Sequence, residues 1–433
     1  MKLPKWSVAP YDVTGQQRKN FLYVQIDAVA IGLASAASPF LPVFLTRLGA
    51  SNVQVGLLSS MPGVTGLVLS VIIGRFLQGR RNIVPWFSLS RLLVVSSYAS
   101  TGLAPFIVPR QYLVPAVLGI WALATIPQTA LSVCFSVVMN AVAGPNLRYD
   151  LMSRRWSILG LTTAIAVTAA GQGLELIGFP VNYQVVFLSF SLGGLLSFYF
   201  SSRIVLPERL PTAPAAAAPG AGAAATGAPG NGAPVLGGRG FGRVLALLQN
   251  YPNFARFSTQ RFIYQFGMLL ATPLFPIYYV REVHASDAWI GFISTSQTAI
   301  LMVGYFLWPR QSRKRGPRFV LLAATFGLAL YPALAASTHQ VLLIALFAGI
   351  AGIFQAGIDL VFFDELMKTV PDELSATFVS IAQSLNYLAA MLAPLFGTWL
   401  AGSIGLAWAL VIATAIRLAG FALFALWKPR PDC

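Results

Sequence analysis

The sequence predicts an all-α integral membrane protein with twelve transmembrane helices in two pseudo-symmetric bundles of six. The first observation is composition: hydrophobic residues make up 56% of the chain and charged residues 10%, whereas soluble domains carry about 25% charged residues. The second is that the apolar residues fall into twelve runs, each long enough to cross a bilayer, which takes roughly 17–25 residues. The third is an internal duplication that relates the two halves of the chain.

The apolar runs define the expected helices in chain order. In the N-terminal half, spans are expected at 21–45, 54–77, 84–107, 113–141, 157–178 and 183–206. In the C-terminal half, they are expected at 257–281, 287–309, 318–337, 340–366, 375–402 and 405–427.

Composition changes between the sixth and seventh runs, which divides the chain into two bundles, 21–206 and 257–427. The linker between them, 207–256, begins with an Ala/Pro/Gly-rich stretch that runs to residue 240, is nearly free of charge and is typical of a flexible tether. Its last part, 241–251, has an amphipathic pattern that favours a helix lying along the membrane interface. Short cytoplasmic termini are expected at 1–20 and 428–433.

The duplication is clearest where PFLPVFLTRLGASNVQVGL (39–57) aligns with PLFPIYYVREVHASDAWIGF (273–292). The matching residues are Pro39 with Pro273, Pro42 with Pro276, Phe44 with Tyr278, Arg47 with Arg281 and Gly56 with Gly291. A chain that is apolar throughout and duplicates half of itself is most simply a transporter built from two repeats around a central path. The paired prolines permit kinks at equivalent places in spans one and seven, where they either serve gating or only shape the helix ends.

The net charge of +16 indicates topology rather than nucleic-acid binding. With the N-terminus inside, 24 of the 29 Lys and Arg residues lie on the cytoplasmic side and three outside, the bias that orients membrane proteins during insertion. We therefore expect a multi-pass protein of the cytoplasmic membrane with both termini cytoplasmic and no nucleic-acid partner. The two histidines fall in loops and no motif of a soluble active site occurs, so no metal, no cofactor and no enzymatic activity are expected.

A basic turn after the second span adds a family resemblance. Residues 72–81 read IIGRFLQGRR, and Gly79, Arg80 and Arg81 match the end of the turn Gly-x-x-x-Asp-Arg-x-Gly-Arg-Arg of the major facilitator superfamily. Phe76 and Leu77 stand where that family has its Asp-Arg pair. The second copy of the turn, after the eighth span, keeps only positive charge, at Arg310, Arg313, Lys314, Arg315 and Arg318. With the duplication and the topology, the chain resembles this superfamily over essentially its whole length.

The resemblance implies a central cavity lined by the first, fourth, seventh and tenth spans. Charges within apolar spans are costly and need a partner or a wet cavity, so Asp27, Arg261 and Asp359 are the leading candidates for function. In one interpretation Asp27 or Asp359 carries a proton and Arg261 couples it to the substrate. In a second, Arg261 pairs with one or both carboxylates as a cytoplasmic gate, and in a third, Arg261 and Asp27 only reach the lipid headgroups.

Polar side chains repeat along single helical faces and mark candidate binding residues. Gln128 and Ser132 on span four are four residues apart, and a long amide near the membrane centre needs a partner or water. The expected substrate-binding residues are Gln128, Ser132, Ser35, Tyr264, Gln265, Gln355, Gln383 and Asn386.

These observations predict a secondary active transporter that moves a small neutral or amphipathic organic solute by alternating access. Proton coupling is favoured over sodium because carboxylates are available and no cluster of oxygen ligands is evident. The expected partners are the substrate, protons and the lipid bilayer, and the protein is expected to act as a monomer. The alternatives are a non-transporting assembly factor or binding subunit with the same fold, and a multidrug or metabolite efflux antiporter.

Overall fold

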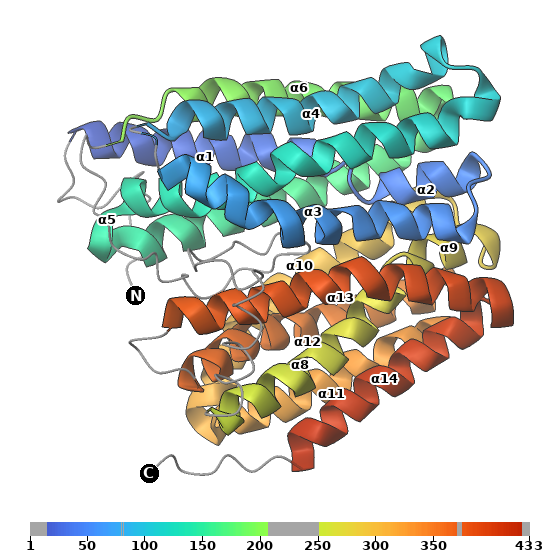
Figure 1. Ribbon diagram of the computed structural model, residues 1–433. Coiled ribbons are helices and arrows are strands. Elements are labelled where there is room, and N and C mark those ends of the chain that lie inside the picture. The colour runs from blue at the N-terminus through green and yellow to red at the C-terminus, as the bar shows by residue number, and fades with distance from the viewer. Residues whose placement is uncertain (1–14, 79, 81, 207–250, 370–374, 427–433) are drawn as a thin grey trace, which may run out of the picture.

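The protein is described by a computed structural model over residues 15–78, 80, 82–206, 251–369 and 375–426, and the described chain folds into two helical bundles (Figure 1). The N-terminal bundle contains α1 (Gly15–Ser35), α2 (Phe40–Arg47), α3 (Asn52–Gln78), α4 (Val84–Ile107), α5 (Leu113–Leu176) and α6 (Val181–Ser202), with a short 3-10 turn at Arg110–Tyr112. The C-terminal bundle contains α8 (Pro252–Ala271), α9 (Leu274–Arg281), α10 (Asp287–Arg315), α11 (Pro317–Ala336), α12 (Val341–Lys368), α13 (Ser375–Ile404) and α14 (Leu406–Leu426).

The membrane character predicted from composition is confirmed. Eleven segments within the described residues are long and apolar enough to cross a bilayer. The remaining predicted span forms α4, which has 24 residues but carries Arg91 and several serines that lower its hydropathy. Arg91 is buried inside the bundle, so α4 keeps its place in the fold through polar contacts that hydropathy does not register.

The duplicated prolines mark breaks in two predicted spans. The first span divides into α1 and α2, with Pro39 at the start of α2, and the seventh divides into α8 and α9, with Pro273 at the start of α9. Proline has no backbone N–H to donate, so each proline interrupts the hydrogen bonds of the helix at the position of the break. The short helices α2 and α9 lie side by side at one end of the molecule, which we call the α2/α9 end (Figure 1).

The fourth and fifth predicted spans belong to one continuous helical segment, α5, and no loop separates them. Its two arms, which correspond to 113–141 and 157–178, run in opposite directions and are joined by helical turns near residues 144–150 (Figure 1). The consequence is that Arg155, which falls between the expected spans 113–141 and 157–178, lies within the second arm and is buried.

The expected flexible tether, 207–240, lies outside the described residues. So does the expected interfacial helix, 241–251, except for residue 251. The structure begins the seventh span at Pro252, five residues before the expected start at 257, because Pro252 occupies the first helical turn, where its missing N–H is not needed.

The orientation of the bundles in the membrane stays a prediction and can be tested by labelling. The lopsided distribution of Lys and Arg places the linker inside and the turn between α11 and α12 outside. In a variant with Cys134 and Cys433 changed to serine, Ala228→Cys and Thr338→Cys should each react with a membrane-impermeant maleimide from opposite faces of sealed, oriented vesicles. Reaction of both from the same face would contradict the predicted topology.

Candidate functional site

Asp27 is buried inside the N-terminal bundle between two arginines. Arg91 of α4 donates to Asp27 Oδ1, and the Ser197 hydroxyl of α6 donates to the same oxygen at 2.6 Å. Arg155 of α5 approaches the other oxygen, with its Nη2 3.6 Å from Asp27 Oδ2. The three charged side chains are each exposed by 3% or less, so this cluster ties four helices together out of contact with solvent.

The cluster carries one more positive charge than negative. The guanidinium carbon of Arg91 lies 4.5 Å from the Phe87 ring centre, and that of Arg155 lies 4.5 Å from the Phe135 ring centre. Such ring faces attract a cation and partly offset the missing second carboxylate. The expected pair between Asp27 and Arg261 is therefore not formed in this structure, because Asp27 already serves as the counter-ion of Arg91 and Arg155.

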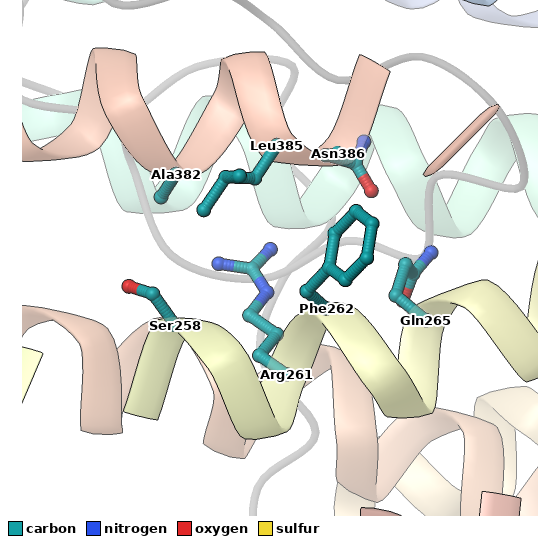
Figure 2. Close-up of a pocket in the computed structure, with 7 residues that line it drawn as sticks. All are labelled: Ser258, Arg261, Phe262, Gln265, Ala382, Leu385 and Asn386. Atoms are coloured by element: carbon teal, nitrogen blue, oxygen red, sulfur yellow. The ribbon is translucent and has the colours of Figure 1, made fainter. Parts of the chain in front are cut away.

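Arg261 lies instead in a small pocket between α8 and α13, and its guanidinium points from α8 toward α13 (Figure 2). Within the described chain it has no carboxylate within salt-bridge distance. Its guanidinium carbon lies 5.6 Å from the centre of the Phe362 ring. Gln265 and Asn386, both predicted as binding residues, line the same pocket. The pocket is lined by Ser258, Arg261, Phe262, Gln265, Ala382, Leu385 and Asn386.

Asp359 on α12 forms a second polar group within the C-terminal bundle. Gln355, one turn earlier, donates to Asp359 Oδ1 at 2.8 Å, and the Tyr305 hydroxyl of α10 donates to Oδ2 at 2.9 Å. Within the described chain Asp359 has no cation within salt-bridge distance. The sequence placed Gln355 and Asp359 on one helical face. It missed Tyr305 because that residue comes from the eighth span, which is not among the four expected to line the cavity.

The other predicted binding residues are not brought into the Arg261 pocket. Tyr264 is fully buried inside the C-terminal bundle, where its hydroxyl donates to the Thr325 carbonyl at 2.8 Å. Ser132 donates to the Thr129 carbonyl of its own helix at 2.8 Å. Gln383 has a buried amide nitrogen without a hydrogen-bond partner in the described chain. Gln128 and Ser35 are partly buried in the N-terminal bundle and do not line the pocket.

At the α2/α9 end the two bundles are joined by a pair of arginines that the duplication made equivalent. Arg47 binds Asp287, with an Nη2–Oδ1 distance of 2.9 Å, and donates to the Ala285 carbonyl at 3.2 Å. Arg281 donates to Asn52 Oδ1 at 2.6 Å and to the Ala50 carbonyl. In the repeat register, Ala50 matches Ala285 and Asn52 matches Asp287. We call this set of six residues the arginine clasp.

The clasp is symmetric in position but not in charge. Its Arg47 half is an ion pair, and the Tyr183 hydroxyl of α6 also donates to Asp287 Oδ1, at 2.6 Å. Its Arg281 half ends on a neutral amide. The sequence alignment contained the signal for this site, since an arginine and a polar residue five or six positions later recur in both repeats.

Glycines let the bundles approach closely just inside the clasp. A Cβ added at Gly171 of α5 would come within 2.9 Å of the Asp287 carbonyl oxygen on α10. On the other side of the interface, Gly56 and Gly66 of α3 face Thr398 and Tyr387 of α13. Small residues at such crossings permit tight helix packing in a bilayer.

Hydroxyl groups join the two bundles further along the interface from the clasp. Thr168 of α5 and Thr295 of α10 lie across the interface with their hydroxyls 2.9 Å apart, and Thr295 also donates to the Ala164 carbonyl. Asn386, which lines the pocket, immediately precedes Tyr387, the residue that faces Gly66. The packed interface thus extends from the α2/α9 end to the α13 residue beside the pocket.

Comparisons with known proteins agree with this architecture. A family model described as Major Facilitator Superfamily matches residues 257–432. A mutant of the nucleoside transporter NupG has a similar structure, with a TM-score of 0.69 and 12% identity over 94% of this chain and 99% of that one. A D-xylose–proton symporter matches with a TM-score of 0.68 and 13% identity over 94% and 97% of the two chains.

A bacterial homologue of the iron transporter ferroportin, in an inward-facing state, matches with a TM-score of 0.71 and 11% identity over 96% of this chain and 99% of that one. No curated protein matches the sequence. The family match covers less than half of the chain, and the solved structures show a shared fold. The second bundle is similar to the major facilitator superfamily, and the described chain as a whole has the fold of these transporters. Its structural relatives are transporters rather than enzymes.

The basic turn after α3 departs from the superfamily pattern, and the structure shows which contact stands in its place. Arg80 stacks on Phe76, with its guanidinium carbon 4.5 Å from the ring centre, and also approaches Trp86. An arginine–aromatic contact therefore stands where the family has an acidic residue. Gly79 and Arg81 lie outside the described residues. In the second copy, Arg310 and Arg315 belong to the last turns of α10 rather than to a loop, where positive charge complements the helix dipole.

Proposed function

We propose that this protein is a secondary active transporter that moves a small amphipathic organic solute across the membrane by alternating access, acting as a monomer. The observation that carries this proposal is the position of the pocket. Arg261, Gln265 and Asn386 line a pocket on α8 and α13, and the clasp joins the two bundles at the α2/α9 end through polar contacts. Bundles joined in this way can rock about the pocket and expose it to either face in turn.

We further propose that protons drive transport through Asp359. Asp27 is occupied by two arginines, so it is held as a structural charge, whereas Asp359 has only neutral hydrogen-bond donors within the described chain. Tyr305 and Gln355 would retain Asp359 in place whether or not it carries a proton, because both hydroxyl and amide groups can rearrange their hydrogen bonds. A carboxylate inside a membrane helix is expected to have such a role.

The test uses the purified protein in proteoliposomes with an inward proton gradient and a mixture of amphipathic solutes, whose accumulation is followed by mass spectrometry. The wild-type protein should accumulate at least one solute, and a protonophore should abolish the accumulation. Asp359→Asn should lower gradient-driven accumulation by at least about ten-fold, since a neutral side chain cannot cycle a proton, while exchange at equal pH persists. Asp364→Asn, an exposed carboxylate on the same helix, is the matched control.

Two results would contradict the proposal. Accumulation by Asp359→Asn at the wild-type rate would remove the proton role from this residue. Failure of the wild-type protein to move any solute, with or without a gradient, would favour the non-transporting alternative.

A further inference from the structure

The Arg261 pocket is built from hydrogen-bond donors that have no acceptor. A guanidinium offers five N–H donors and accepts nothing. Arg261 forms no hydrogen bond or ion pair with any described residue, and its ring contact with Phe362 is a weak substitute for a counter-ion. Arg261 is only partly exposed, and a positive charge partly withdrawn from water is costly unless an anion or a strong acceptor approaches it.

A second unpartnered donor faces the same pocket. Ser258 lies one turn before Arg261 on α8, is exposed by 4%, and its hydroxyl has no hydrogen-bond partner in the described chain. Ser and Thr hydroxyls within helices commonly donate to a carbonyl of their own helix, as the neighbouring Thr259 of α8 does at 2.9 Å. An unpaired buried hydroxyl next to an unpaired guanidinium indicates that an acceptor is missing between them.

Across the pocket, α13 supplies one amide and an apolar wall. Asn386 can donate from its amide, whereas Leu385 and Ala382 offer only carbon surface, and Phe262 extends the apolar side from α8 (Figure 2). The pocket thus has a polar part that favours negative charge and an apolar part that favours a hydrocarbon or aromatic body. The internal carboxylates do not complete it, since Asp27 and Asp359 are engaged elsewhere.

We propose that this pocket binds an organic anion, with the carboxylate, sulfonate or phosphate group on Arg261 and Ser258 and the apolar body against Phe262 and Leu385. The proposal rests on the transport function above and narrows its amphipathic solute to the anionic class. Charge-assisted hydrogen bonds from a guanidinium to such a group are about twice as strong as neutral ones, which gives the pocket its selectivity. A free solute and an anionic lipid headgroup share this chemistry, so the test separates them.

The experiment measures the thermal stability of the full-length protein in a nonionic detergent with benzenesulfonate, octanesulfonate or the neutral benzenesulfonamide. These sulfonates stay charged at all working pH values, which removes effects of probe ionisation. Both sulfonates should raise the Tm of the wild-type protein, and benzenesulfonamide should not. Arg261→Gln should weaken sulfonate binding by about ten- to hundred-fold, the range expected for losing a charged hydrogen-bond donor.

Two further variants sharpen the result. Ser258→Ala should weaken binding by a smaller factor, about three- to ten-fold, because it removes a neutral donor. Arg261→Lys should retain part of the binding, since it keeps the charge but not the planar pair of donors. Arg256→Gln, an exposed arginine on the same helix, is the matched control and should bind the sulfonates as the wild type does. If Arg261→Gln does not fold, Ser258→Ala and Arg261→Lys carry the comparison.

Equal responses to benzenesulfonate and benzenesulfonamide, or full binding by Arg261→Gln, would overturn the anion site. So would a site that takes phosphatidylglycerol but neither sulfonate, because the ligand would then be lipid and not solute. Proteoliposomes separate this proposal from the transport function. Sulfonate binding without any uptake would keep the site and reject the transporter, and uptake of neutral solutes without sulfonate binding would do the reverse.

Discussion

Asp27→Asn is expected to lower the stability of the folded protein by about 3–5 kcal/mol, because it leaves Arg91 and Arg155 buried together without a carboxylate. An intact buried ion pair contributes little to net stability. Removing one partner is nevertheless strongly destabilising, because the remaining charge then lacks both water and a counter-ion. The ring faces of Phe87 and Phe135 cannot replace the carboxylate for two cations at once.

The measurement is the thermal unfolding of detergent-purified protein, together with the fraction that elutes as a monodisperse peak. Asp27→Asn should lose several degrees of Tm and much of the monodisperse fraction. The double variant Asp27→Asn with Arg91→Gln should recover part of the loss, because it restores the original net charge of the cluster. Asp27→Asn with Arg261→Gln should recover nothing, since Arg261 does not contact Asp27.

Two outcomes would reject the cluster as a structural element. Wild-type stability of Asp27→Asn would show that Asp27 is solvated, as the headgroup interpretation requires. Rescue by Arg261→Gln rather than by Arg91→Gln would restore the pair that the sequence predicted between the first and seventh spans.

The fold was predictable because its signals are local and repeated. Apolar runs of bilayer length predict helices wherever they occur, and the duplicated prolines predict paired breaks at Pro39 and Pro273, both of which the structure contains. The duplication also required two similar halves, which fixes the division into bundles without knowledge of any contact.

The partners of the buried charges were not predictable in the same way. Which side chains meet depends on the rotation of each helix about its axis, and an uncertainty of one residue turns a side chain by about 100°. Depth alone put Asp27 beside Arg261, but the α1 face that carries Asp27 is turned toward α4 and α6. Arg155 escaped notice because a helical connection replaced the expected loop and moved it into the bundle.

The arginine clasp leads to the second large effect, a shift in which face of the protein is open. Arg47→Gln should open the α2/α9 end, because it removes the ion pair to Asp287 and the bond to the Ala285 carbonyl, and these hold the bundles together there. The pair is partly exposed, so its worth is about 1–2 kcal/mol, which corresponds to roughly a five- to thirty-fold change in population. Arg281→Gln should have a smaller effect, since its side-chain partner Asn52 is neutral.

The readout is the rate at which Thr168→Cys reacts with a membrane-impermeant maleimide in a background without other cysteines. Thr168 sits in the bundle interface against Thr295, so its reaction reports opening of that end. Arg110→Gln, an exposed arginine at the same end, is the matched control and should leave the rate unchanged. Equal rates in Arg47→Gln and the wild type would mean that the clasp does not hold this end closed.

Asn52→Asp tests the same device in the opposite direction. The repeat places Asn52 where the other half has Asp287, so an aspartate there should turn the Arg281 hydrogen bond into a second ion pair and make the clasp symmetric in charge. We expect slower labelling of Thr168→Cys and slower solute exchange in proteoliposomes, because a conformation held more tightly at one face is left less often. Adding Arg281→Gln to Asn52→Asp should return both rates toward or beyond the wild-type values, since an unpaired carboxylate would then face the interface. Faster labelling of Asn52→Asp itself would show that Arg281 closes this end through the Ala50 carbonyl and not through its charge.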